Sequence, residues 1–159
     1  MTDRPTFEYK GQPVRAAGIM VWTRKNGHAH RLFRRIKKKF EDIGGKTDVK
    51  DGTALDTAIR ECVEETHGKL FSECHTPKQC ATQLRARLKN ISDECIECNR
   101  ISKYLLFKLE VEPSILSEPM RRFGLTEDTD WGTLHHYYEW LHSVPYQNQL
   151  HFRLRGLQL

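Results

Sequence analysis

Apolar and polar residues follow one another in patterns that predict strands joined by a hairpin. Residues 16–22 form an apolar run that leads into Asn26 and Gly27, and an Asn-Gly pair between apolar stretches is a strong hairpin signal. Residues 31–36 would form the returning strand. The segment 104–111 alternates between apolar and polar side chains, which is typical of a half-buried strand. Its buried face would consist of Leu105, Phe107, Leu109 and Val111.

A helical spacing of apolar residues predicts an α-helix over residues 53–67. Apolar side chains recur there three or four positions apart, so they would share one face and pack against a core. These side chains are Leu55, Ile59, Cys62 and Val63. Thr53 and Asp56 resemble a capping box, in which the hydroxyl and the carboxylate accept hydrogen bonds from amide groups of the first turn.

Further elements complete a mixed pattern. A second helix is predicted over 77–89, because proline suits the first turn of a helix and Pro77 stands there. Residues 137–141 form a short predicted strand. Apolar residues recur at helical spacing near the end of the sequence, at Tyr146, Leu150, Leu154 and Leu157. Strands and helices intermixed in one small chain indicate the α/β class and an α/β/α sandwich.

Clustered carboxylates mark the polar side of the helix predicted over 53–67. Glu61, Glu64 and Glu65 project from one face, and their like charges repel one another. A divalent cation would neutralise this repulsion, and hard oxygen ligands favour Mg²⁺ or Mn²⁺. The alternative is a solvated acidic helix. Gly44 and Gly45, predicted as a turn, favour the metal site, because their backbone freedom would let a carbonyl face the metal and a phosphate approach closely.

The segment 44–70 resembles the signature of the Nudix hydrolase family, G-x5-E-x7-R-E-U-x-E-E-x-G-U, where U is a bulky apolar residue. The stretch Arg-Glu-Cys-Val-Glu-Glu matches this signature closely. With Gly45 as the signature glycine, Asp51 replaces the first glutamate, and one extra residue separates it from the signature arginine. His67 stands in place of the last glycine, and Gly68 follows one residue late. These departures leave the role of Asp51 open.

The resemblance implies a Nudix-fold α/β/α sandwich with a mixed central sheet, and a metal-dependent pyrophosphohydrolase. Glu64 and Glu65 would bind Mg²⁺ or Mn²⁺, and the Gly45 carbonyl would complete the set of ligands. Glu61 would be a further ligand or the general base. Arg60 would orient these carboxylates through charge-assisted hydrogen bonds. Many members of the family recruit one more acid from a late loop, for which the candidates are Glu127, Asp128, Asp130 and Glu139.

The substrate implied is a nucleoside diphosphate linked to another group, such as a nucleotide, a nucleotide sugar, a dinucleoside polyphosphate or a capped RNA. The residues that choose among these lie outside the signature. A different class of protein stays open: a nucleotide- or RNA-binding module that keeps the fold but has little or no turnover. A homodimer also stays open.

Positive charge adds a polyanion to the candidate partners. The net charge is +5 and the isoelectric point is about 9.0, which favours attraction to nucleotides or RNA. Arg34 and Lys37 precede the two glycines and Lys46 follows them, so these three are candidates for binding substrate phosphate. The alternative is that the basic residues before the glycines belong to a solvated strand end and loop.

Length and composition point to one domain over residues 1–159. No run of eighteen apolar residues occurs and no secretory leader is visible, so we expect an intracellular, cytoplasmic protein that does not enter a membrane. The five cysteines form an odd count, which favours free thiols. The alternative is a zinc site, for which the candidate ligands are Cys74, Cys80, Cys95 and Cys98.

Overall fold

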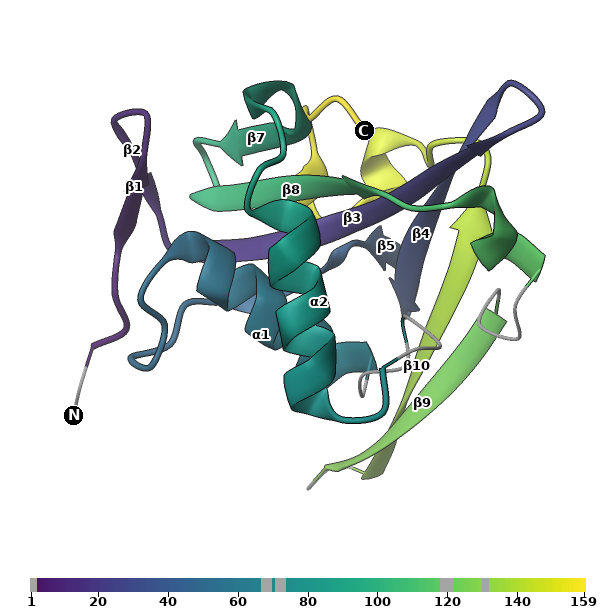
Figure 1. The fold of residues 1–159 in the computed structure, drawn as a ribbon, viewed down its shortest axis with the longest axis horizontal. Coiled ribbons are helices and arrows are strands. Elements are labelled where there is room, and N and C mark those ends of the chain that lie inside the picture. Colours follow the sequence, from purple (N-terminus) through teal and green to yellow (C-terminus); the bar gives the residue numbers. More distant parts are fainter. Residues whose placement is uncertain (1–2, 67–69, 71–73, 118–121, 130–131) are drawn as a thin grey trace.

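The computed structural model describes the backbone of residues 3–66, 70, 74–117, 122–129 and 132–159, and the side chains of these residues outside 117–137. Its main feature is an eight-stranded mixed sheet in the order β7-β8-β3-β4-β10-β9, with β5 paired to β4 and β6 paired to β3 (Figure 1). The strands are β3 (Ala16–Lys25), β4 (His28–Ile36), β5 (Lys39–Glu41), β6 (Ile43–Lys46), β7 (Ile96–Asn99), β8 (Tyr104–Glu110), β9 (Arg122–Thr129) and β10 (Gly132–Leu141). A small hairpin of β1 (Phe7–Tyr9) and β2 (Gln12–Val14) stands apart.

The predicted hairpin between β3 and β4 is confirmed. Asn26 and Gly27 have φ values of 53° and 78°, the positive values that tight hairpin turns require. β3 also pairs in parallel with β8 and antiparallel with β6, so the sheet is mixed as predicted. The segment predicted over 137–141 is the last half of the longer strand β10.

The two long strands of the hairpin pair only over the four residues of each strand that lie next to the turn. Residues 22–25 of β3 pair with residues 28–31 of β4. Beyond that point β3 pairs with β6, while β4 pairs with β5 and β10. The chain passes from β5 to β6 through Asp42, so Glu41 and Asp42 lie where the two halves of the sheet separate.

Both predicted helices are present. α1 (Ala54–Thr66) packs on β3 and β6, and α2 (Pro77–Leu88) packs on α1 and β8. The hydroxyl of Thr53 accepts a hydrogen bond from the Asp56 amide at 3.1 Å, as the predicted cap requires. The Asp56 carboxylate accepts from the Gly52 amide, one residue earlier than in a standard capping box. Among the described residues, no helix is long and apolar enough to cross a membrane.

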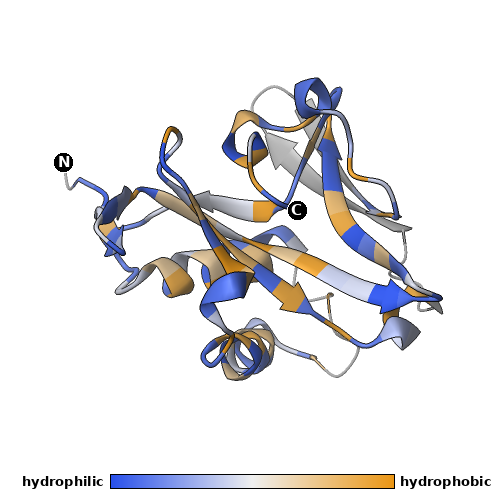
Figure 2. Ribbon diagram, turned by 90° about the horizontal axis from the view of Figure 1, so that it is seen from above, coloured by the Kyte–Doolittle hydropathy of each residue, from blue (hydrophilic) through white to orange (hydrophobic). Residues whose placement is uncertain are grey.

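Each face of the sheet is covered by a different part of the chain. α1 and α2 cover one face, and residues 146–159, which we call the C-terminal segment, cover the other (Figure 2). Leu150 and Leu154 of this segment pack on side chains from β3, β4 and β8. The α/β class with a mixed central sheet between two outer layers is therefore confirmed.

The predicted buried face of residues 104–111 is confirmed, since Leu105, Phe107, Leu109 and Val111 are all buried. The opposite face is exposed only at its end: Glu110 is exposed, but Tyr104 and Leu106 are buried because the C-terminal segment covers them. That segment contains two short 3₁₀ turns, Gln147–Gln149 and Phe152–Leu154, instead of an α-helix. The His151 amide donates to the Phe40 carbonyl at 2.8 Å, so bonding to β5 interrupts the helical pattern.

Candidate functional site

The two glycines before α1 belong to strand β6, so the predicted turn at Gly44 and Gly45 is wrong. Neither residue has a positive φ value. Glycine is needed for another reason, which is close approach. A Cβ atom at Gly45 would lie 2.5 Å from Oε1 of Glu61, and a Cβ atom at Gly44 would strike the Tyr104 hydroxyl and the backbone of β3. Gly45 therefore lets a carboxylate of α1 rest against the strand.

Arg60 is the centre of the acidic face of α1. Its guanidinium donates two hydrogen bonds of 3.0 Å to the carboxylate of Asp51, in a bidentate pair. It also donates to Glu61 at 3.0 Å and to Glu64 at 3.3 Å. A fifth bond of 2.9 Å reaches the carbonyl of Lys46 at the end of β6. Arg60 thus orients the carboxylates, as the sequence predicts, and ties the helix to the strand.

Asp51 has a structural role that the sequence leaves open. It is buried, and it accepts hydrogen bonds from the Thr57 hydroxyl at 2.8 Å and the Asp48 amide at 2.9 Å. Burial alone would raise the pKa of Asp51, but the hydrogen bonds from Arg60, Thr57 and Asp48 outweigh burial and lower it. The extra residue before Arg60 therefore does not prevent the pairing.

Asp51→Asn should lower the free energy of unfolding by about 2 kcal/mol at pH 7, because Arg60 loses a charged bidentate acceptor. The lowered pKa stabilises the folded state above the ordinary carboxyl pKa of 3.8, and this stabilisation is lost as the pH falls through the folded-state pKa. The difference between wild type and variant should therefore shrink on acidification. Urea unfolding at pH 7 and pH 3 measures it, and an equal difference at both pH values would contradict this account.

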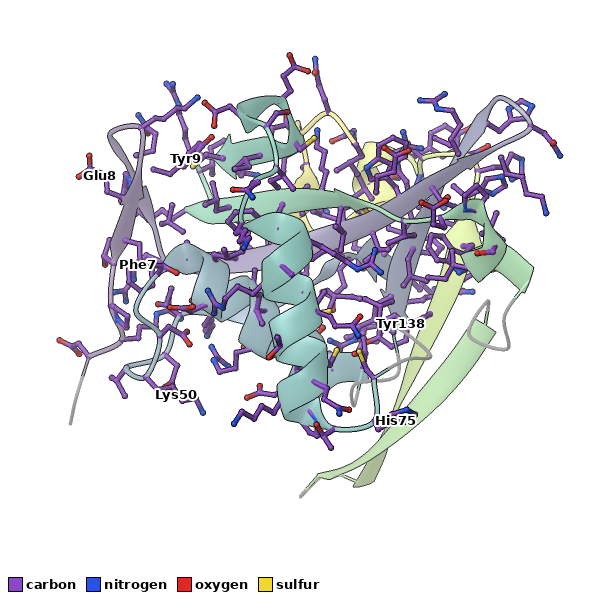
Figure 3. All side chains as sticks on the ribbon, viewed as in Figure 1. Phe7, Glu8, Tyr9, Lys50, His75 and Tyr138 are labelled. Atoms are coloured by element: carbon purple, nitrogen blue, oxygen red, sulfur yellow. The ribbon has the colours of Figure 1, made fainter. Side chains whose placement is uncertain are left out.

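Glu65 pairs with a different arginine from Glu64. Its Oε1 lies 3.0 Å from Arg34, and its Oε2 is buried with no hydrogen-bond partner in the described structure. Burial raises the pKa of Glu65 to about 8, against the opposing effects of Arg34 and Arg153. Tyr138 on β10, labelled in Figure 3 near the end of α1, donates to the Glu65 carbonyl at 3.0 Å. This carboxylate is therefore positioned but incompletely satisfied.

The predicted phosphate-binding cations lie in different surroundings. Arg34 is buried, with only 7% of its surface exposed, and it pairs with Glu65 and with Glu41 at 3.4 Å. It therefore contacts carboxylates and is not part of a solvated loop. Lys37 is exposed in the turn between β4 and β5, and Lys46 is exposed at the end of β6.

The remaining predicted acids differ in exposure. Glu61 is partly buried, and this burial raises its pKa, with a smaller contribution from Glu64 and an opposing one from Arg60. Glu64 has 53% of its side chain exposed. Glu139 pairs in register with Phe33, so it lies on the sheet face opposite α1 and away from Glu65. The side chains of Glu127, Asp128 and Asp130 lie outside the described residues.

The sequence does not predict a second buried cluster, which consists of Asp42, Tyr104 and Arg153. Asp42 is fully buried and accepts a hydrogen bond from the Tyr104 hydroxyl. Arg153 donates to a carboxylate oxygen of Asp42 at 2.9 Å and to its carbonyl at 3.0 Å, and stacks 4.8 Å from the centre of the Tyr104 ring. Burial would lower the pKa of Arg153, but Asp42 and its acidic neighbours raise it.

The Arg153 cation also reaches the acidic face. Its Nη2 lies 3.8 Å from Glu41, which pairs in turn with Arg34. It favours the ionised forms of Glu61 and Glu65 as well. One chain of opposite charges therefore runs from the C-terminal segment, between β5 and β6, to the carboxylates of α1.

The carboxylates of α1 have the chemistry of a site for a hard divalent cation. Glu65 has an unsatisfied oxygen, and burial raises the pKa of both Glu61 and Glu65 although neighbouring arginines oppose this effect. Within the described residues, however, no three His, Cys, Asp or Glu side chains converge as a metal site. Arg60 holds Glu61 and Glu64 while Arg34 holds Glu65. Binding a cation would therefore require these carboxylates to turn away from the arginines.

The five cysteines are free thiols, as expected. Cys62 and Cys80 are buried, and burial raises the pKa of Cys62, which makes it a poor nucleophile. The zinc alternative gains no support from the described residues, among which no suitable cluster occurs.

A scan against models of known protein families finds no match to this chain, and a search of curated proteins finds no similar sequence. The geometry of the α1 carboxylates is therefore the basis for the function proposed next.

Proposed function

We propose that this protein is a Nudix-type hydrolase that cleaves the diphosphate bond of a nucleoside diphosphate linked to another group. The observation that carries the proposal is the packing of Glu61 against Gly45, with Arg60 joining Glu61 and Glu64 to the end of β6. Because Gly45 has no side chain, the Glu61 carboxylate can lie directly against the backbone of β6.

Each residue has a distinct role in this proposal. Glu64 and Glu65 would hold Mg²⁺ or Mn²⁺, and Glu61 would be a further ligand or the general base. A divalent cation bound there supplies charge neutralisation on the phosphoryl oxygens and lowers the pKa of the attacking water. Arg60 pairs with Glu61 and Glu64 while no cation is bound, and its pair with Asp51 would remain when they turn to the cation. Lys46 and Lys37 are exposed and would bind the substrate phosphates.

One observation favours a binding module instead. Arg60 and Arg34 already satisfy much of the carboxylate charge without a metal. A protein that binds nucleotides or RNA without turnover would need no more than this arrangement. A cytoplasmic location and a homodimer stay predictions under either function.

The two functions are separated by a hydrolysis screen with Mg²⁺ and Mn²⁺. The substrates are nucleoside triphosphates, nucleotide sugars, dinucleoside polyphosphates, diphosphoinositol phosphates and capped RNA, compared by kcat/KM. Metal-dependent release of a phosphate product from at least one class supports the hydrolase. Binding of these compounds with no turnover under either metal would instead support the binding module.

The metal assignment can be tested without activity. Adding Mg²⁺ at pH 8 should raise the Tm of the wild type, because a ligand that binds only the folded state stabilises it. The rise should be much smaller in Glu65→Gln, which lacks a ligand charge. Differential scanning fluorimetry with and without EDTA measures this, with the exposed Glu94→Gln as matched control. An equal response in Glu65→Gln and the control would remove Glu65 from the metal site.

A further inference from the structure

Charge is strongly segregated along this chain. Residues 10–40 and 140–159 contain twelve of the 26 Lys and Arg residues and none of the 21 Asp and Glu residues. The rest of the chain therefore carries fourteen basic and 21 acidic residues. The net charge of +5 conceals one strongly basic part and one acidic part.

The two basic segments lie side by side in the fold. The C-terminal segment lies on the sheet face opposite the helices (Figure 2). There Leu150 and Leu154 pack on side chains from β3, β4 and β8. The Lys39 ammonium donates to the Asn148 carbonyl, and the His151 amide donates to the Phe40 carbonyl. β5 and the C-terminal segment are thus joined, and their positive charges add on one side of the molecule. We call this side the basic face.

Exposed cations without acidic partners make up the basic face. Arg34 and Arg153 are buried in ion pairs, but seven other cations on β3, β4, β5, their turns and the C-terminal segment are exposed. None of the seven pairs with a carboxylate within the described part of the chain. They are Arg24, Lys25, Arg35, Lys37, Lys38, Lys39 and Arg155.

Two aromatic side chains of the C-terminal segment are also exposed. Tyr146 has 80% of its surface exposed and Phe152 has 58%. The ring of Phe152 also contacts that of His151, with 4.8 Å between the ring centres. Large exposed rings beside unpaired cations are the two components of a surface that binds unpaired bases by stacking and their phosphates by charge.

We propose that the basic face binds single-stranded nucleic acid, with bases stacked on Tyr146 and Phe152 and phosphates held by the lysines of the β4–β5 turn. A duplex fits this surface poorly, because its bases are already stacked and cannot reach the two rings. An anionic membrane would engage the cations but would not need flat ring surfaces.

Strand β5 leads from the basic face towards the carboxylate site. It begins at Lys39 and ends at Glu41, which pairs with the buried Arg34 beside Glu65. The α1 carboxylates lie on the opposite face of the sheet, so the binding of nucleic acid to the basic face is separate from the proposed hydrolase function.

The test measures binding in EDTA, where metal-dependent turnover is absent. Fluorescence anisotropy of a labelled single-stranded 15-mer oligouridylate is followed against the full chain at several salt concentrations. Tyr146→Leu combined with Phe152→Leu should weaken binding about tenfold or more, because the variant cannot stack on bases although it keeps much of the apolar volume. Tyr146→Phe is the matched control and should bind as the wild type does.

The charge contribution is tested separately. Lys37→Gln combined with Lys38→Gln should weaken binding and reduce the slope of log affinity against log salt by about 1.4, or about 0.7 for each phosphate of a single strand that is no longer neutralised. Lys78→Gln combined with Lys89→Gln, on the helix side of the sheet, should leave both quantities unchanged. All the substituted side chains are exposed, so thermal unfolding should confirm intact folds.

Three results would overturn the proposal. They are equal affinity for a duplex of the same sequence, unchanged binding in the double leucine variant, and equal weakening in the Lys78 and Lys89 control. Binding to phosphatidylserine vesicles that depends on the same lysines, with none to oligouridylate, would assign the face to membranes instead. Hydrolysis of small nucleotides by the double leucine variant tests the hydrolase function separately. A normal kcat/KM would support that function whether or not the binding proposal holds.

Discussion

Glu64→Gln should lower kcat/KM for metal-dependent hydrolysis by about 10² to 10⁴, which is the decrease expected when a major electrostatic contribution to the transition state is removed. The fold should remain intact, because 53% of the side chain is exposed and its one described ion pair is the 3.3 Å pair with Arg60. Both effects come from one assay of a substrate that the wild type hydrolyses, together with a thermal unfolding curve.

Glu112→Gln is the matched control, since Glu112 is an exposed glutamate beyond the end of β8. It should retain wild-type kcat/KM. If kcat/KM of Glu64→Gln lay within a few-fold of this control, Glu64 would not be a metal ligand.

Arg153→Met should lower the free energy of unfolding by about 3–5 kcal/mol, because it leaves the buried Asp42 carboxylate without its cation. Methionine keeps most of the apolar stem, so the decrease reports mainly the missing charge. Urea unfolding at pH 7 provides the measurement. Arg155→Met, two residues further on and exposed, is the control and should cost far less.

A second variant shows whether the cost arises from the unpaired carboxylate. Asp42→Asn keeps a side chain that can accept from the Tyr104 hydroxyl, and combined with Arg153→Met it should recover part of the stability. If the double variant were no more stable than Arg153→Met, the ion pair would not be the source of the effect.

Local patterns in the sequence predict the elements whose stability is local. The Asn-Gly turn, the capped start of α1 and the proline at the start of α2 are each determined by neighbouring residues, and all three occur in the structure. The pairing of β3 with both β6 and β8 has no such local signal, since it depends on residues far apart in the sequence.

The errors have a common physical cause. The sequence suggests backbone freedom as the reason for Gly44 and Gly45, whereas the fold uses their lack of a side chain. The sequence suggests that Arg34 binds phosphate or is solvated, but alternation along β4 turns it towards Glu65. The helical spacing at the end of the sequence arises from packing of Leu150 and Leu154 on the sheet. In each case a tertiary contact overrides the local pattern.

The contacts in the candidate site likewise include some that the sequence predicts and others that it does not. Arg60, Glu61 and Glu64 lie on one helix, so their mutual contacts follow from helical spacing. The pair between Asp51 and Arg60 is not predictable, because the loop between them has an extra residue. Asp42 and Arg153 are 111 positions apart, and neither belongs to a recognisable motif.

The separation of Asp42 and Arg153 along the sequence also sets the order in which parts of the protein can fold during synthesis. The ribosome makes β6 and α1 roughly a hundred residues before Arg153. Arg153 is the cation that pairs with Asp42 between β5 and β6. Until then, Asp42 is an unpaired acid, and Met20, Phe33 and Leu106 have no covering layer. A nascent chain therefore passes through a stage with exposed apolar surface, for which chaperones and proteases compete. The C-terminal segment thus acts as the checkpoint for assembly of the site.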